Sequence, residues 1–424
     1  MQSSNQLQDM LHSINRKSYP AYKSLKGAYQ FKKYVLSIDH VQGDPFASPS
    51  HVSVKIFHRE AGFPAEYYKD KLTRITLADY LTRRFEQQVN RYTFRAKGSG
   101  KSGLISVTRC GQEVLERTAC EITEQGITVR FFVGFPANGR TINAGELEKI
   151  FFEFLPVCVE KAFVYRNLSG KDLENTIFLA EDQAYIREEL KKRFLVAFVN
   201  DGAILPRESG ISSKPMKGSV TFSSPESLRV IMALPHKGKI TGMGIPKGIT
   251  LIVGGGYHGK STLLNALELG VYNHIQGDGR EYVITDSTAQ KLRSEDGRFV
   301  KDVDISLFIN DLPNKKDTTC FSTEDASGST SQAAGIVEGI EAGSKVFLLD
   351  EDTSATNFMV RDAFMQHVIS REKEPITPFL ERARDLYEKE EISTILVAGS
   401  SGAFFHIADI VIQMDNYMPV DITE

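Results

Sequence analysis

The chain has 424 residues, a formal net charge of −3, 41% hydrophobic residues and 25% charged residues. This composition is typical of a globular protein with two or three packed domains, and it excludes a disordered or collagen-like chain. No apolar run approaches the roughly 18 to 20 residues that a membrane-spanning helix needs, and the four cysteines form no CxxC pair. We therefore expect a soluble protein without a membrane span, with reduced thiols in a reducing compartment.

Charge is distributed unevenly along the sequence. Residues 1–100 contain 16 lysines and arginines against 8 acidic residues, a net of +8, so the remaining 324 residues carry 35 against 46, a net of −11. A basic face that meets a polyanion would produce this split, and so would charges scattered over a solvated surface. The acid-free stretch 10–38 would also suit a transit peptide, but its five aromatic residues favour folded structure. We expect a cytoplasmic protein, or a mitochondrial one if the source is eukaryotic.

The first half of the chain predicts a mixture of short helices and strands. Alternating apolar residues and helical spacing give the following elements: strands at 34–38, 51–57, 104–107 and 127–133, and helices at 76–90, 145–163 and 181–193. A loop rich in Gly, Ser, Lys and Pro follows at 201–225. We place the domain boundary there, with an N-terminal basic α+β domain over 1–200 and an α/β nucleotide-binding core over 201–424.

The clearest motif of the second half is a glycine-rich loop that matches GxxxxGK[ST]. An apolar run at 248–253 predicts the strand before it, and an amphipathic run at 261–269 predicts the helix after it, which is the context that this motif requires. Backbone N–H groups would surround the phosphates of ATP, Lys260 would reach the β- and γ-phosphates, and Ser261 would be a Mg²⁺ ligand. The predicted nucleotide-binding residues are Gly254, Gly255, Gly256, Tyr257, His258, Gly259, Lys260, Ser261 and Thr262.

A second segment, residues 98–102, resembles the end of such a loop. No apolar strand leads into it, and Arg95 stands where the first glycine of the motif would be. We interpret it as a flexible basic loop that does not bind nucleotide.

Two further segments complete the predicted ATP chemistry. The run 345–349 predicts a buried strand whose end presents Asp350, which would hold Mg²⁺ directly or through water, and Glu351, which would orient the attacking water. Just over 20 residues earlier, a helix opens on small residues. Their N–H and hydroxyl groups would bind the γ-phosphate of a second molecule, or would only cap the helix; these residues are Ser327, Gly328 and Ser329.

These motifs resemble those of the predicted ATPases of the ABC class. The resemblance spans nearly the whole chain and rests on residues 38–47, 242–246, 254–262, 277–281, 326–332 and 350–359. It implies an ABC-type P-loop core that forms a head-to-tail homodimer with two ATP molecules between the copies. It also implies that Lys260, Ser261, Asp350 and Glu351 act in cis, and that 327–329 act in trans.

The chain also departs from general ABC proteins. Tyr257 and His258 replace small residues of the phosphate loop, and Asp352 stands where a proline usually follows the glutamate. The switch histidine expected after the strand at 393–399 is missing, so His258 or a serine such as Ser400 would contact the γ-phosphate instead. The catalytic candidates are therefore Glu351, Lys260, His258 and Ser400. The sequence identifies no convincing Q-loop or adenine platform; 304–310 and Phe222 are weak candidates.

The N-terminal half suggests what the ATP is used for. Basic residues there would neutralise phosphates, and the aromatic residues between them would stack on unpaired bases. The candidates are Arg83, Arg84, Arg91, Arg95, Lys97 and Lys101, interleaved with Phe85, Tyr92 and Phe94. The resemblance favours RNA over DNA, since some family members are RNA-associated. We predict an ATPase coupled to nucleic acid; the alternatives are a regulatory or metabolic ATPase that acts on protein partners, and a peripheral ATPase subunit of a transporter.

Overall fold

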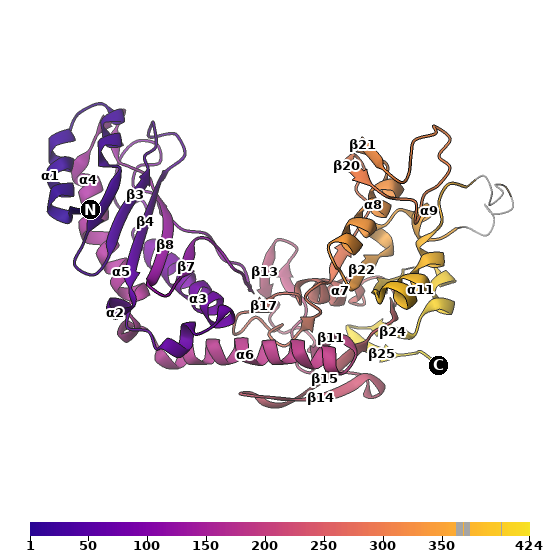
Figure 1. Cartoon of the computed structure of the whole chain (residues 1–424). Helices are drawn as coiled ribbons and strands as arrows, with labels where there is room; N and C mark the ends of the chain where they lie inside the picture. Colours follow the sequence, from indigo (N-terminus) through magenta and orange to yellow (C-terminus); the bar gives the residue numbers. More distant parts are fainter. Residues whose placement is uncertain (362–367, 369–373, 400) are drawn as a thin grey trace. The chain divides into compact units, whose positions relative to one another are not determined.

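The computed structural model describes residues 1–361, 368, 374–399 and 401–424. It divides the chain into two compact units, which we call the N-terminal unit (Met1–Glu181) and the C-terminal unit (Asp182–Glu424) (Figure 1). The N-terminal unit carries 25 lysines and arginines against 19 acidic residues, a net of +6. This leaves 26 against 35 for the C-terminal unit, a net of −9.

The N-terminal unit is built on a seven-stranded, mainly antiparallel sheet. Its strand order is β1-β2-β3-β4-β8-β5, and β7 also pairs with β8. Side chains of β4 and β8 alternate between buried and more exposed positions, because successive residues of a strand point to opposite faces. The strands are β1 (Gln2–Ser3), β2 (Gly27–Gln30), β3 (Val35–His40), β4 (Ser50–Phe57), β5 (Ile105–Ser106), β6 (Glu113–Val114), β7 (Cys120–Ile122), β8 (Gly126–Val133), β9 (Ala137–Asn138) and β10 (Thr141–Ile142).

Helices cover this sheet and close its core. Helix α3 packs against α5 and β7, and buries Leu77, Leu81 and Phe85 completely, as its helical spacing predicts. The helices are α1 (Ser4–Ile14), α2 (His58–Ala61), α3 (Lys71–Val89), α4 (Ala144–Glu148), a π-helical segment (Lys149–Phe154), α5 (Leu155–Phe163) and α6 (Gly170–Lys192). The predicted strands at 34–38, 51–57, 104–107 and 127–133 are confirmed, as are the helices at 76–90, 145–163 and 181–193.

The C-terminal unit contains two sheets. A four-stranded antiparallel sheet has the order β14-β15-β11-β18, and a six-stranded sheet has the order β19-β22-β23-β16-β24-β25, parallel except for β25. Because β11 pairs with β15 and β18, residues 182–200 belong to this unit, although the sequence boundary was set near residue 200. Among the described residues, no helix combines the length and apolar character that a membrane crossing needs.

The elements of the C-terminal unit have the following bounds. The strands are β11 (Leu195–Asn200), β12 (Arg207–Ser209), β13 (Ser212–Pro215), β14 (Arg229–Leu234), β15 (Gly238–Pro246), β16 (Ile249–Val253), β17 (Asn273–His274), β18 (Ile284–Thr285), β19 (Gln290–Leu292), β20 (Arg298–Val303), β21 (Phe321–Ala326), β22 (Val346–Asp350), β23 (Ser393–Val397), β24 (Ile410–Asp415) and β25 (Met418–Asp421). The helices are α7 (Lys260–Leu269), α8 (Gly328–Glu341), α9 (Thr356–Met359) and α11 (Phe379–Glu390).

The register of the six-stranded sheet aligns the strand ends that matter for chemistry. Asp350 of β22 lies opposite Val397 of β23, and Val397 lies opposite Ile252 of β16. Since these strands are parallel, their carboxyl ends meet at one edge of the sheet. The phosphate loop after β16 and the acids at the end of β22 therefore belong to the same edge.

Candidate functional site

The phosphate loop follows β16 and ends where α7 begins, as predicted. Gly254 has a φ of +144°, and a Cβ there would lie 2.4 Å from the carbonyl oxygen of Met414. Gly259 has a φ of +97°, and a Cβ there would lie 2.7 Å from the ring of Tyr417. Glycine is thus required at both ends of the loop by backbone conformation and by close approach. Gly259 is also the N-cap of α7 and offers no capping side chain, which leaves the first N–H groups of α7 available to an anion.

Lys260 is the first residue of α7. Its Nζ donates to the carbonyl oxygens of Gly254 and Gly255 at 2.5 and 2.8 Å, so the ammonium group is folded back over the loop. Phosphate oxygens would replace these carbonyls as acceptors, because a charged acceptor binds an ammonium group more strongly. Ser261 is exposed in the first turn of α7, and Thr262 follows it, half-buried.

The two unusual residues of the loop are placed differently. Tyr257 is 99% exposed and has a φ of +65°, a left-handed conformation that costs a non-glycine residue about 1–2 kcal/mol. The His258 ring is instead held in place: its Nδ1 lies 2.9 Å from the backbone nitrogen of Asn416. Its backbone carbonyl accepts the N–H of Tyr417 at 3.0 Å.

The acids at the end of β22 are anchored to their surroundings. Asp350 is 7% exposed, and its Oδ1 accepts the N–H of Asp352 at 3.0 Å. Glu351 accepts the N–H of Gly399 through Oε2 at 2.7 Å, which places its carboxylate at the end of the neighbouring strand β23. Ser400, the serine candidate in this region, lies outside the described residues.

Ser327 caps helix α8. Its Oγ accepts the N–H of Thr330 at 3.4 Å and donates to the hydroxyl oxygen of Thr330 at 2.9 Å, so the capping role weighed from the sequence is present. A Cβ on Gly328 would lie 2.4 Å from the hydroxyl of Ser294, so a larger residue here would displace that side chain. Ser329 is half-buried beside it.

Gln332, which is not among the residues predicted from the sequence, connects α8 to the end of β22. It is 1% exposed; its Nε2 donates to the hydroxyl of Ser354 at 3.0 Å, and its Oε1 accepts the N–H of Ala355 at 3.0 Å. Ser354 in turn donates to the backbone carbonyl of Asp350 at 2.8 Å. A continuous set of hydrogen bonds therefore joins the start of α8 to the strand end that carries Asp350. The signal in the sequence was the position of Gln332 at the end of the 326–332 motif.

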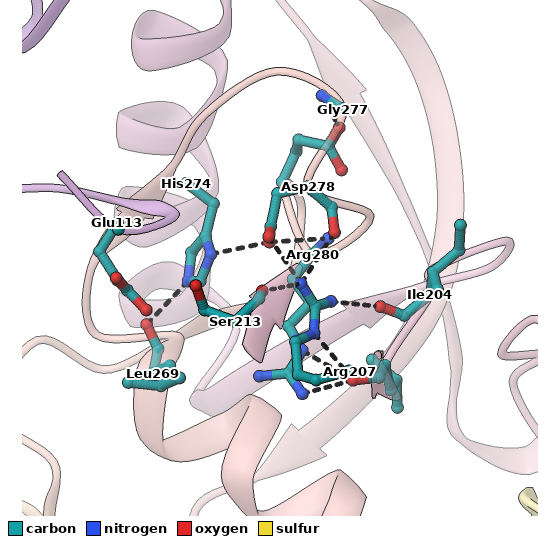
Figure 2. A network of polar contacts seen from close by, with 12 residues as sticks. Glu113, Ile204, Arg207, Ser213, Leu269, His274, Gly277, Asp278 and Arg280 are labelled. Carbon is teal, nitrogen blue, oxygen red and sulfur yellow. Dashed lines mark hydrogen bonds and ion pairs between the residues drawn. The ribbon is translucent and has the colours of Figure 1, made fainter. Parts of the chain in front are cut away.

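A second network fixes the far end of α7, as Figure 2 shows. Asp278, which is fully buried, accepts from Arg207 Nη1 at 2.6 Å and lies 2.9 Å from His274 Nδ1. The other ring nitrogen of His274 donates to the carbonyl oxygen of Leu269, the last residue of α7, at 3.0 Å. Burial opposes the ionisation of Asp278, but the contacts with His274 and Arg207 outweigh it and hold the pKa of the carboxyl below its usual range. The motif at 277–281 thus supports the phosphate-binding helix from its C-terminus.

The weak candidates for the Q-loop and the adenine platform gain no support. Phe222 is 2% exposed and packs in the core of the C-terminal unit, so its ring offers no free face in this structure. In the 304–310 segment, Ile305, Phe308 and Ile309 are buried in the core.

Two of the basic candidates are engaged in internal ion pairs. Arg83 Nε lies 2.7 Å from Oδ2 of Asp79, a carboxylate that is 3% exposed. Arg84 pairs with Asp172 and lies over the ring of Tyr80 at 4.9 Å. Burial opposes the charge of Arg84, but the Tyr80 hydroxyl and the Asp172 carboxylate outweigh it and raise the pKa of Arg84. The sequence could not show the pairing of Arg84 with Asp172, because the two residues are 88 positions apart and only the fold brings them together.

The other basic candidates are more accessible. Arg91, Arg95 and Lys97 are exposed and Lys101 is half-buried. The guanidinium of Arg95 lies 5.0 Å from the ring centroid of Tyr92, and Lys97 Nζ donates to a backbone carbonyl. These four cations lie on or next to one loop, residues 94–103.

The 98–102 segment, expected from the sequence to be a flexible basic loop, lies within a loop of residues 94–103 whose backbone is hydrogen-bonded to other segments. Gly103 has a φ of +82°, and a Cβ there would lie 2.0 Å from the carbonyl oxygen of Ala96. Three N–H groups of the loop donate to carbonyls of other segments: Ser99 to Ala137 at 2.8 Å, Lys101 to Pro45 at 2.8 Å, and Gly103 to Gly134 at 2.9 Å. The loop is therefore a built, hydrogen-bonded structure that holds its basic residues in defined positions.

The fold and the site together define a P-loop ATPase of the ABC type. Residues 169–424 match the model of the P-loop domain of ABC ATPases, and residues 4–166 match the model of the N-terminal region of ATPases of the ABC class. The chain belongs to this family of ABC-class ATPases. The predicted fold class and family are confirmed.

Individual relatives are more distant. The chain is 32% identical over 229 residues to the uncharacterized protein MJ1628 of Methanocaldococcus jannaschii, which covers 52% of this chain and 50% of that protein. It thus spans about half the length of the curated relative it matches. Among solved structures, cbiO1 of Clostridium perfringens, part of the ABC transporter complex cbiONQ, has 13% identity and a TM-score of 0.29, covering 45% of this chain and 86% of that one. The ADP form of MJ1267, an ATP-binding cassette of an ABC transporter, has 12% identity and a TM-score of 0.29, with the same coverage.

Proposed function

We propose that two copies of the chain bind Mg-ATP between them in a head-to-tail dimer, and that ATP controls the binding of single-stranded nucleic acid, RNA in the first place. The observation that carries the dimer is the position of 327–329. Among the described residues, none of these three forms a hydrogen bond with the phosphate loop of its own chain, although they form the N-terminal end of α8. A phosphate bound in the partner's loop would accept hydrogen bonds from the N–H and hydroxyl groups of these residues.

Each residue of the site has a role in this proposal. Lys260 binds the β- and γ-phosphates, Glu351 orients the attacking water, and His258 contacts the γ-phosphate in place of the missing switch histidine. The Ser261 hydroxyl and the Asp350 carboxylate are oxygen donors at the same sheet edge, which is the donor type that Mg²⁺ prefers when phosphate and water supply its other ligands. The ion would neutralise charge on the β- and γ-phosphate oxygens.

The 94–103 loop supports the nucleic-acid part of the proposal. It carries Arg95, Lys97 and Lys101 in fixed positions, and Phe94 is 49% exposed beside them. Phe46 is 60% exposed, and a Cβ on Gly100 of the loop would lie 3.0 Å from its ring, so a second aromatic ring flanks the loop. Phosphates would bind the cations, and unpaired bases would stack on the rings.

The dimer is tested with Glu351→Gln, which keeps ATP bound by removing the carboxylate that activates water. Size-exclusion chromatography with light scattering at micromolar protein should show a dimer with Mg-ATP and a monomer without it. The control is Glu351→Gln combined with Lys260→Ala, which should stay monomeric because ATP is lost. A Glu351→Gln protein that binds ATP and remains monomeric would refute the sandwich.

Nucleic-acid binding is tested by fluorescence anisotropy with a single-stranded RNA of mixed sequence, with and without ATP, at rising salt. The double variant Arg95→Ala/Lys97→Ala should weaken binding and flatten the salt dependence. The matched control, Lys26→Ala/Lys32→Ala, removes two exposed lysines of the same unit outside the loop. Equal losses in both doubles would show that only net charge matters, and no binding at low salt would sink the proposal.

A further inference from the structure

The phosphate loop contacts the end of β24 at Gly254 and the turn between β24 and β25 at Gly259. The carbonyl oxygen of Met414 occupies the space where a side chain of Gly254 would lie, and the ring of Tyr417 occupies the space beside Gly259. These contacts join a motif at residues 254–259 to a turn more than 150 residues later in the chain. We call this turn, Asn416 and Tyr417, the hairpin turn.

The hairpin turn adopts an unfavourable backbone conformation. Asn416 has a φ of +48° and Tyr417 a φ of +67°, as in the two-residue turns that suit a hairpin. Asn is tolerated there, but a tyrosine in the left-handed region costs about 1–2 kcal/mol, and glycine would cost nothing. Strain of this kind is found where a structure holds functional groups in place.

Both N–H groups of the turn are directed at His258. The N–H of Asn416 donates to Nδ1 at 2.9 Å, and the N–H of Tyr417 donates to the backbone carbonyl of His258 at 3.0 Å. A backbone N–H can only donate, so Nδ1 accepts and carries no proton. The proton of the neutral ring is therefore on Nε2.

Two charged groups lie near the ring and the loop. Asp415 Oδ1 lies 3.1 Å from Nδ1 and accepts a hydrogen from the side-chain amide of Asn416 at 3.0 Å, so the backbone N–H of Asn416 is the donor that assigns the lone pair to Nδ1. Lys260 is directed at the loop carbonyls of Gly254 and Gly255. The Nε2 edge of the ring lies on the loop: a Cβ on Gly255 would be 3.3 Å from Nε2.

We propose that the hairpin turn is a positioning element that fixes His258 as an Nε2–H donor toward the γ-phosphate. His258 is then a hydrogen-bond donor to the charge that develops in the transition state, not a general base, because a base would need a lone pair on Nε2. The inference rests on the proposed contact between His258 and the γ-phosphate, and it adds how the contact is oriented and by which residues.

The donor is tested with three substitutions of His258. In His258→Gln the amide nitrogen can take the place of Nε2, whereas in His258→Asn it reaches only the place of Nδ1. We expect Gln to keep kcat within about threefold, and Asn and Ala to lower it by about tenfold or more, with ATP affinity changed by less than about threefold. Equal losses for Gln, Asn and Ala would overturn the assignment of the donor to Nε2.

A pH profile separates a donor from a base. The protonated imidazole also carries a hydrogen on Nε2, so wild type and His258→Gln should have parallel profiles of kcat between about pH 6 and pH 8. An acid-side fall in kcat that wild type shows and His258→Gln lacks would identify a base and overturn the proposal.

The turn is tested by inserting one glycine between Asn416 and Tyr417, which displaces both N–H groups. We expect kcat to fall to the level of His258→Ala, with no further loss when the two changes are combined. The control is Tyr417→Phe, which keeps both N–H groups and the ring beside Gly259, so kcat should stay within about threefold of wild type.

The outcomes separate this inference from the proposed function. If His258→Ala has the same kcat as wild type, His258 takes no part in the reaction. Loss of kcat in His258→Ala but not in the insertion variant would refute only the role of the turn. If the insertion prevents folding, the kcat values of the His258 variants still test the proposal. They should be higher for His258→Gln than for His258→Asn and His258→Ala, and a different order overturns the proposal.

Discussion

Arg83 and Arg95 should respond in opposite ways to truncation, although both are basic residues of the same segment. Arg83 pairs with the buried Asp79 and donates to the backbone carbonyls of Gly111 and Glu113. Arg83→Ala removes the donor of the Gly111 carbonyl and the nearer of two donors of the Glu113 carbonyl, at about 1 kcal/mol each. It also leaves Asp79 with Arg117 as its remaining ion-pair partner, which costs about another 1–2 kcal/mol. The expected loss is about 3–4 kcal/mol.

Arg95→Ala is the matched comparison. Its guanidinium is exposed and lies over Tyr92, a contact that is worth less than about 1 kcal/mol at the surface. Calorimetry should show a fall of roughly 6–16 °C in the unfolding temperature of the N-terminal unit for Arg83→Ala, against at most about 4 °C for Arg95→Ala. In RNA binding the order reverses: Arg95→Ala should reduce the salt slope by about 0.7, and Arg83→Ala should leave it unchanged. An unchanged unfolding temperature with a reduced slope for Arg83→Ala would refute this reasoning.

Three further changes test other parts of the structure. Gln332→Leu should lower kcat by about tenfold with ATP binding retained, because α8 loses its hydrogen bonds to the segment behind the acids; unchanged kcat in a steady-state assay would exclude this coupling. The folded-state pKa of Asp278 is lowered, so its contribution to stability is present above its unfolded value of about 3.9 and is lost as the pH falls through the folded value. Asp278→Asn should therefore be less stable than wild type near neutral pH, and its free energy of unfolding should depend less on pH in acid. Parallel curves of stability against pH for the two proteins would contradict the assignment. Gly103→Ala should lower stability by more than about 3 kcal/mol in urea unfolding, whereas Gly139→Ala, with a φ of +60° and open space around its Cβ, should cost about 1 kcal/mol; equal costs would show that the contact with Ala96 is relieved easily.

The sequence predicted the phosphate loop and the acids because their patterns are local. A strand, a glycine-rich loop and a helix follow one another within residues 248–269, and an apolar run leads directly into Asp350. The same local reasoning gave most strands and helices of the N-terminal unit. It needed no knowledge of which segments meet in space.

What the sequence missed depends on contacts between distant segments. Arg84 is engaged by Asp172, which is 88 residues away in the sequence. The partner of Arg83, Asp79, is four residues earlier on the same helix, but the fold brings Arg117 to the same carboxylate. The 98–102 segment looked flexible because glycine and serine dominate it, but the carbonyls that bind it come from residues 45, 134 and 137. Likewise, the hairpin turn that holds His258 lies at the other end of the unit's sequence.

The strength of nucleic-acid binding follows from which cations remain accessible. With Arg83 and Arg84 held by carboxylates, four of the six candidates, Arg91, Arg95, Lys97 and Lys101, are left to meet phosphates. Four contacts to a single strand give a slope of log K against log salt of about −2.8, whereas six would give about −4.2. Between 50 and 200 mM salt, affinity should therefore fall by roughly 50-fold and not by roughly 300-fold. A slope near −4 in the anisotropy titration would mean that Arg83 and Arg84 leave their partners when RNA binds, or that the partner copy adds cations of its own.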